Sequence, residues 1–366
     1  ESMNQGNERS LLMLLTPLHP KIGQALRYQD VKVCYLAGQN SWTGDKIKEA
    51  VENHIKVEDI EIKMLLSDED SKLLKAGRLL EIPHLPDINH ALASCLRRTF
   101  EKNESYKKLV KQISSYQCKL VNQEISYLRP PKQRVKARFM NQKGFVRWAE
   151  VLLENFDKLE EEEQGFFLEL PEHQDLLNIL GKCIDLAEKI LETLKIKGLS
   201  NETIKEVEQI LFQEWFIMMN FVPISKPIEI NCLVSLNNQE ATSIPSKIQT
   251  GGGEQDLFGQ FLKEVKKYVD RYKSFLETNK GVFNISTDII ESLFGKYKSI
   301  KASNPFVGIS KIDLEIPVYC LTEQQIIDLT EIALETTLVS DLKKFVKDKS
   351  SDNQLIKRRD FFKNGT

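Results

Sequence analysis

The sequence has few cysteines, no internal repeat and no long apolar run. None of its six cysteines belongs to a CxxC pair or has a closely spaced His, which argues against a zinc site or a disulfide framework. No run of about 18 apolar residues occurs, so the sequence predicts no membrane-spanning helix. The first apolar stretch, Leu11 to Leu15, is too short for a signal peptide and lacks a basic leader. We therefore expect a protein of the cytoplasm with reduced thiols.

The charges are nearly balanced in number but unevenly distributed. The formal net charge is −2, whereas the segment from Arg97 to Arg147 holds 14 lysines and arginines against three glutamates, a local net charge of +11. The rest of the chain then carries about −13. Such a basic segment favours a polyanion as its partner.

The first 90 residues alternate between strand and helix signals. Compact apolar runs predict strands at 10–15, 31–36, 60–66 and 82–85. Helical spacing of apolar residues predicts one helix over 43–55, with Thr43 as its N-cap, and another over 70–80. Apolar strands separated by helices are typical of an α/β fold whose sheet is covered on both faces.

After residue 90 the pattern changes to long amphipathic helices. We expect a helical insertion domain over 91–254, in which Ser200 caps a helix and three consecutive glycines mark a connection near the end. The α/β core over 1–90 is then expected to resume over 255–310, and a helical tail to follow over 311–366. The predicted fold class is α/β, interrupted by a large all-α insertion.

Three short segments place carboxylates where they can do chemistry. Asp68 follows a predicted buried strand, so it projects at the sheet edge where open α/β folds place ligands. Glu291 borders the apolar stripe of a predicted helix over 286–298, and Asp87 and His90 lie close together at a helix start. Asp68 and Asp87 also suit N-caps, and Glu291 also suits a solvated helix side. The residues alone leave both interpretations open.

These segments resemble parts of the RNase H-like (DDE-type) DNA transposases. The run from Leu66 to Ala76 looks like the strand and helix around the family's second aspartate, and Asp87-x-x-His90 is similar to the C/D-x-x-H motif of hAT-like members. Residues 289–298 resemble the glutamate helix, in which a catalytic Glu precedes lysines. The separation of 223 positions between Asp68 and Glu291 matches the all-helical insertion of the hAT-like arrangement.

The resemblance implies an RNase H-like mixed sheet flanked by helices, and a metal-dependent reaction. Asp68 and Glu291 would supply two ligands for Mg²⁺ or Mn²⁺, and His90, with Asp87 of the same motif, would lie near the scissile phosphate. The family's first aspartate would precede Glu1, so this chain, which starts with Glu rather than Met, would lack it and the N-terminal DNA-binding domain. A Tyr and an Arg that precede the glutamate in one subgroup are here Asn284 and Thr287.

The basic segment supplies candidate DNA contacts. After two prolines, a cation occupies every second position from Lys132 to Arg138, which an extended backbone presents on one face. Trp148 is a candidate to stack on an unpaired base, as an insertion-domain Trp does in the hAT-like enzymes. Its place in the apolar pattern of a helix over 145–153 favours a core position instead. The predicted DNA contacts are Arg129, Lys132, Arg134, Lys136, Arg138, Arg147, Trp148, Lys296 and Lys298.

The implied function is a DNA transposase that cleaves phosphodiester bonds and joins strands at transposon ends. Its expected partners are double-stranded DNA, both transposon ends and target, and further copies of itself in a dimer or larger assembly. Its expected location is the bacterial cytoplasm, near the nucleoid and away from membranes. Two alternatives stay open: an inactive transposase-derived DNA-binding protein, and a helical protein-interaction scaffold. With two of the three acids, the chain itself is expected to be inactive.

Overall fold

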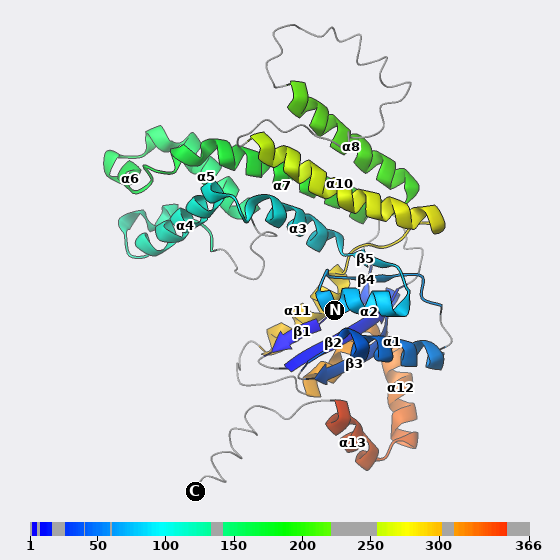
Figure 1. Ribbon diagram of the computed structural model, residues 1–366. Helices are drawn as coiled ribbons and strands as arrows, with labels where there is room; N and C mark the ends of the chain where they lie inside the picture. The colour runs from blue at the N-terminus through cyan, green and yellow to red at the C-terminus, as the bar shows by residue number, and fades with distance from the viewer. Residues whose placement is uncertain are drawn as a thin grey trace. The chain divides into compact units, whose positions relative to one another are not determined.

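The computed structural model describes residues 2–5, 8–16, 26–39, 41–58, 61–132, 142–220, 255–301 and 311–349 (Figure 1). The chain divides into two units. Residues 1–87 and 281–366 form the first, which we call the discontinuous unit, and residues 88–280 form the second, the helical unit. The described residues have a mostly helical mixed fold with few strands.

The described strands of the discontinuous unit form two small sheets. β1 (Ser2–Gln5), β2 (Glu8–Leu15) and β3 (Lys32–Gln39) are antiparallel, in the order β1-β2-β3. β4 (Leu65–Ser67) and β5 (His84–Pro86) form a separate parallel pair. The single sheet expected from the sequence is thus divided here. The strand predicted over 60–66 begins only at Leu65 in the structure, and residues 61–64 have no regular secondary structure.

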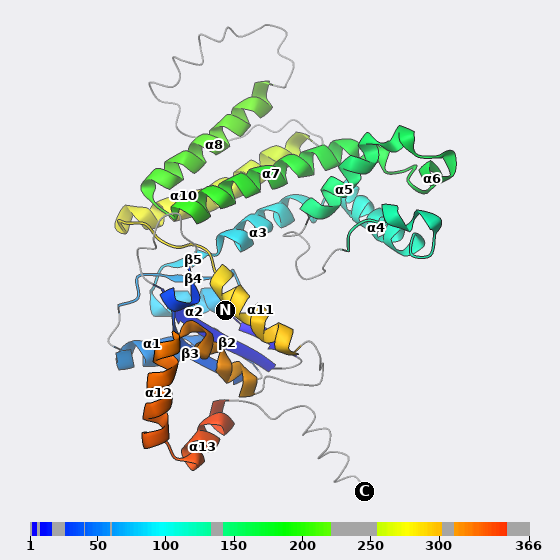
Figure 2. The same ribbon diagram turned by 180° about the vertical axis from the view of Figure 1, so that it is seen from behind.

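Both faces of the three-stranded sheet are covered by helices. Figures 1 and 2 show α1 (Gly44–Glu58) and α2 (Ser71–Leu80) on one side of it and α11 (Asp288–Lys301) on the other. Leu11 of β2 packs with residues of α1 and α2, whereas Leu12 packs with residues of α11. Adjacent strand residues point to opposite faces. The apolar run of β2 is therefore buried from both sides.

Side-chain caps fix where several of these helices begin. The Thr43 Oγ1 accepts a hydrogen bond from the Lys46 N–H at 3.3 Å, one residue before α1. The Ser200 Oγ accepts one from the Thr203 N–H at 3.1 Å, just before α8 (Asn201–Asn220). Each cap satisfies a backbone donor that the first helical turn leaves without an intrahelical partner. The capping roles predicted for Thr43 and Ser200 are confirmed.

The helical unit is built around a core of long amphipathic helices. Besides α8, its described helices are α3 (Ile88–Phe100), α4 (Glu104–Lys119), α5 (Lys143–Glu154), α6 (Glu161–Phe166), α7 (Gln174–Lys197) and α10 (Gln255–Thr278). Short 3-10 helices occupy 124–128, 156–158 and 171–173. α10 packs against α3, α7 and α8, and α5 packs against α7. Their facing apolar stripes exclude water from the centre of the unit.

One predicted domain boundary is wrong, because helix α10 belongs to the helical unit. The sequence pattern assigned residues 255–280 to the returning α/β core, whereas the structure places them in the helical unit. The buried stripe of α10 includes Phe261, Val265 and Tyr272. This stripe packs against α3, α7 and α8, which all belong to the helical unit. The chain re-enters the discontinuous unit at Gly281.

The C-terminal region adds helices to the discontinuous unit. A 3-10 segment (Lys311–Cys320) contributes Ile316 and Cys320 to the core cluster beneath α11, together with residues near a short 3-10 turn (Tyr28–Asp30). α12 (Glu323–Thr336) and α13 (Val339–Lys349) follow. Among the described helices, none combines the length and apolar character that crossing a bilayer requires.

Replacing Phe261 by Ala is expected to lower the free energy of unfolding by about 3–5 kcal/mol, because its fully buried ring would leave a cavity. Leu168→Ala, at a side chain 67% exposed in the same unit, is the control and should change it by less than about 0.5 kcal/mol. Urea unfolding followed by circular dichroism measures both. Equal effects would contradict the placement of α10 in this core.

Candidate functional site

Asp68 lies in the turn between β4 and α2. The preceding Ser67 is buried, and its hydroxyl lies 2.8 Å from the His84 Nε2 and 3.0 Å from the Asp68 carbonyl oxygen. Asp70, rather than Asp68, caps α2 by accepting from the Lys72 N–H at 2.8 Å. The half-buried Asp68 is thus held at the strand end by its neighbours and does not serve as the helix cap.

Glu291 lies in the first turn of α11. The buried face of this helix consists of Ile290, Leu293 and Phe294, which pack beneath β2 and β3. Glu291 itself is exposed, and its backbone N–H donates to the Thr287 carbonyl at 3.2 Å. The helix is therefore anchored by its apolar side, and the carboxylate is carried at the margin of that side.

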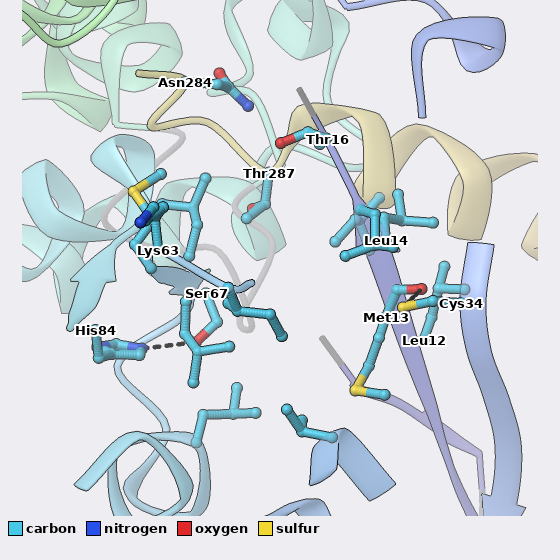
Figure 3. Close-up of a pocket in the computed structure, with 18 of the residues that line it drawn as sticks. Leu12, Met13, Leu14, Thr16, Cys34, Lys63, Ser67, His84, Asn284 and Thr287 are labelled. Atoms are coloured by element: carbon cyan, nitrogen blue, oxygen red, sulfur yellow. Dashed lines mark hydrogen bonds between the residues drawn. The ribbon is translucent and has the colours of Figure 1, made fainter. Parts of the chain in front are cut away.

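One cavity connects the segments that carry the two acids. It has a volume of about 280 Å³ and lies entirely within the discontinuous unit, between β2 and the segment ending in β4 (Figure 3). We call it the β2–β4 cavity. Its lining includes Ser67 and Ile290, the chain neighbours of Asp68 and Glu291. The fold therefore brings the strand end and the start of α11 to the same cavity, although the two acids are 223 positions apart in the sequence.

The described side chains do not complete a metal centre. Within the described ranges, no group of three or more His, Cys, Asp or Glu side chains is arranged to hold a metal ion. Mg²⁺ is commonly bound through one or two carboxylates, and water and substrate phosphate oxygens fill the rest of its shell. Asp68 and Glu291 would be the protein ligands of such an ion.

Asp87 has a structural role instead of the predicted catalytic one. Its side chain is fully buried, and its Oδ2 accepts hydrogen bonds from the Thr287 N–H at 2.6 Å and from the Thr287 hydroxyl at 3.1 Å. Thr287 directly precedes α11, so the carboxylate also lies at the helix N-terminus, where negative charge is stabilised. A carboxylate enclosed in this way is not accessible to a substrate.

The other half of the predicted motif belongs to the other unit. His90 lies in the first turn of α3 and is half-buried. The boundary between the two units falls between Asp87 and Ile88. Asp87 and His90, close together in the sequence, are therefore placed by different cores.

The predicted DNA-binding segment is described only in part. Arg134, Lys136 and Arg138 lie outside the described residues. Before them, Lys132 is exposed and Arg129 is half-buried, and the Gln117 side chain fixes the backbone by donating to the Pro130 carbonyl at 2.6 Å. Arg147 is exposed on α5.

A second basic surface, which the sequence analysis did not single out, lies on α4. Its exposed side carries four lysines, Lys107, Lys108, Lys111 and Lys119, while its opposite side packs into the core. Glu104 pairs with Lys107 at 2.7 Å. The signal was present in the sequence, because these lysines recur at helical spacing. The helical unit therefore has a basic face on α4, a helix that precedes the predicted DNA-binding segment in the sequence.

Two of the predicted DNA contacts are occupied by packing interactions. The indole N–H of Trp148 donates to the Leu128 carbonyl at 2.9 Å, and its ring lies 6.4 Å from that of Tyr116 and 6.2 Å from that of Phe167. The Lys296 ammonium lies over the Tyr28 ring, 4.0 Å from its centre. Trp148 is thus part of the aromatic core, and Lys296 makes a cation–π contact. The side chain of Lys298 lies outside the part of the chain that the structure describes.

The chain was also compared with known proteins. A scan against protein-family models gave no match, and a search of curated proteins found no sequence with significant similarity. Function is therefore inferred from the residues and their geometry.

Replacing Asp87 by Ala is expected to lower the free energy of unfolding by about 2–4 kcal/mol, because the buried donors of Thr287 would lose their acceptor. Asp70→Ala, which removes an exposed helix cap, is the control and should cost about 1 kcal/mol. Chemical unfolding measures both. An Asp87→Ala protein as stable as the parent would argue against the structural role.

Proposed function

We propose that this chain is part of the catalytic core of an RNase H-like DNA transposase, acting on phosphodiester bonds at transposon ends. The proposal is supported by the order of the elements. An antiparallel sheet is followed by a helix, β4, a second helix and β5, which is parallel to β4. The helical unit comes next, and α11 then returns to the first unit.

One observation carries most of this proposal: Ser67 and Ile290 line the same cavity. Asp68 and Glu291 are the next residues in the chain, so the segments that carry the two acids form walls of one cavity, although neither acid is among its lining residues. α11 belongs to one apolar cluster, and α2, which follows Asp68, contributes Leu73 and Ala76 to another. Regular elements anchored in this way position groups more rigidly than loops do. The assignment of Asp68 and Glu291 as the reacting acids belongs to the proposal.

The charge of the helical unit supports a role in holding DNA. The lysines of α4 and the exposed Lys132 and Arg147 all belong to this unit, as do the cations at 134, 136 and 138. Contacts of this kind neutralise phosphates without reading sequence. We propose that the helical unit binds the DNA backbone and that the discontinuous unit carries the chemistry.

A second candidate is a DNA-binding protein without catalytic activity. The observation that favours it is that the described residues include no group of three or more His, Cys, Asp or Glu side chains arranged to hold a metal ion. The two candidates share the DNA-binding surface and differ in whether a third carboxylate joins Asp68 and Glu291. DNA binding and DNA cleavage must therefore be measured separately.

Binding is tested with the quadruple variant Lys132→Ala, Arg134→Ala, Lys136→Ala and Arg138→Ala. We expect weaker binding to duplex DNA and a salt dependence flattened by up to about four units of slope, because fewer counterions are released. The control removes four exposed lysines of the same unit, Lys182, Lys189, Lys195 and Lys205. Fluorescence anisotropy at several salt concentrations gives the slopes. An equal loss in both variants would indicate attraction by net charge alone.

Cleavage is tested by comparing this chain with a protein extended upstream to supply a third acid. We expect the chain itself not to nick supercoiled plasmid with Mg²⁺ or Mn²⁺, and the extended protein to nick it. Glu291→Gln in the extended protein should reduce cleavage by at least ~100-fold, a scale typical for loss of one charge-stabilising group, with little change in DNA affinity.

Asp288→Asn, in the same turn of α11, is the matched control and should keep cleavage nearly unchanged. Cleavage by the unextended chain at the rate of the extended protein would show that another acid of residues 1–366 completes the site. Cleavage by neither protein, with intact DNA binding, would favour the non-catalytic candidate.

A further inference from the structure

Ser67, which directly precedes Asp68, is held through both its backbone and its side chain. The Ser67 carbonyl accepts a hydrogen bond from the N–H of Asp87, the residue after β5, at 2.9 Å. The Ser67 Oγ lies 2.8 Å from the Nε2 of His84 in β5, a contact that Figure 3 shows as a dashed line. It also lies 3.0 Å from the Asp68 carbonyl oxygen. The peptide group of Asp68 is therefore restrained by the side chain of its neighbour.

The two contacts of the Ser67 hydroxyl determine which atoms donate. A carbonyl oxygen can only accept, so the single hydroxyl proton of Ser67 is directed to the Asp68 carbonyl. The Ser67 Oγ then accepts from His84, which requires a proton on the Nε2 of the imidazole ring. The hydrogen bonds thus run in one direction, from His84 through Ser67 to Asp68.

His84 is itself held closely by helix α2. The side chain is half-buried, and a Cβ placed on Gly77 of α2 would lie 3.1 Å from the His84 Cβ. Alanine at position 77 would require His84 to shift by a few tenths of an ångström. Glycine is unfavourable in a helix interior, so this close approach gives Gly77 a structural reason. The donor of the Ser67 hydroxyl is therefore fixed in place.

The residue after β5 is connected to the other predicted acid. Asp87 accepts hydrogen bonds from the backbone N–H and the hydroxyl of Thr287. The Thr287 carbonyl in turn accepts from the Glu291 N–H at 3.2 Å. The segment from His84 to Asp87 thus contacts both the strand end that carries Asp68 and the helix start that carries Glu291.

We propose that His84 is a positioning residue that holds Asp68 through the Ser67 hydroxyl, so that β5 sets the separation of Asp68 from Glu291. This inference rests on the proposed function, in which the two acids act together. A residue that orients a metal ligand does so without touching the ion, and its loss typically lowers metal affinity or activity by about 10- to 100-fold. His84 needs no contact with DNA for this role.

A Ser–His pair can also activate the serine as a nucleophile, but the geometry disfavours that role here. Activation requires the hydroxyl proton to be directed to the imidazole ring, which then removes it. The Ser67 hydroxyl donates instead to the Asp68 carbonyl, and Ser67 is buried. The hydrogen bonds therefore suit positioning and not nucleophilic attack.

The direction of the hydrogen bonds is tested by nitrogen NMR of the chain with isotope-labelled histidines. The signals that disappear in His84→Gln belong to His84. At a pH of about 9, where imidazole is ordinarily neutral, we expect the proton of this ring on Nε2. A neutral ring with its proton on Nδ1 would make Nε2 an acceptor and would overturn the proposal. This measurement does not depend on metal binding or cleavage.

The effect on Asp68 is tested by the affinity of the chain for Mn²⁺ alone, measured by electron paramagnetic resonance of the free ion. We expect His84→Leu and Ser67→Ala each to weaken binding by about 10-fold or more. The double variant should bind no more weakly than the weaker single variant, because both changes remove the same hydrogen bonds. His84→Gln, whose side-chain amide can donate to Ser67, should recover most of the affinity.

Thr43→Ala is the matched control for loss of stability. It removes one hydroxyl hydrogen bond in the same unit, at the N-cap of α1, without changing charge. It should lower the urea midpoint about as much as Ser67→Ala and leave Mn²⁺ affinity nearly unchanged. Full affinity in His84→Leu, or losses that multiply in the double variant, would overturn the proposal. Mn²⁺ binding that Asp68→Asn does not weaken would count against the proposed function instead, and the NMR result would still decide how Ser67 is held.

Discussion

Helix α11 holds the two parts of the discontinuous unit together. Its buried side packs under β2 and β3, and Asp87 accepts both polar hydrogens of Thr287 at the start of this helix. A buried carboxylate is costly without such donors, so Asp87 favours the arrangement in which α11 is in place. Asp87 and Thr287 are 200 residues apart. Loop-closure entropy grows slowly with length, and the intervening helices have their own core, so the insertion adds little further cost.

The sequence predicted local structure well wherever periodicity and caps determine it. The predicted strands that correspond to β2 and β3, the predicted helices that correspond to α1, α2 and α11, and the caps at Thr43 and Ser200 agree with the structure, whereas β1 was not predicted. Residue patterns do not show which apolar stripe packs against which. The stripe of α10 suits either unit, and only its contacts with α3, α7 and α8 assign it to the helical one. Local sequence patterns also could not predict that the described strands form two separate sheets.

The roles of the candidate site residues depend even more on contacts that the sequence pattern does not show. Asp87 has the sequence context of both a cap and a catalytic acid, and the deciding fact is a partner 200 residues away. Trp148 is an aromatic residue in a basic segment, and its role is decided by the Leu128 carbonyl and two neighbouring rings. The lysines of α4 could have been found by helical spacing, because their exposure depends on the face of a single helix. The roles of Asp68 and Glu291 stay predictions.

The two-sheet arrangement bears directly on how well Asp68 is positioned. Asp68 follows a strand of three residues, and in the described part of the chain that strand pairs only with β5. Isolated two-stranded ladders are marginally stable, whereas catalytic groups need placement within about 0.5 Å. The Ser67 hydroxyl near His84 and the apolar cavity wall restrain the strand end from one side. In the plane of the ladder, the Leu65 N–H bonds to the Pro83 carbonyl and the Asp87 N–H to the Ser67 carbonyl. The position of Asp68 therefore depends on β5 and on the buried Asp87 that follows it.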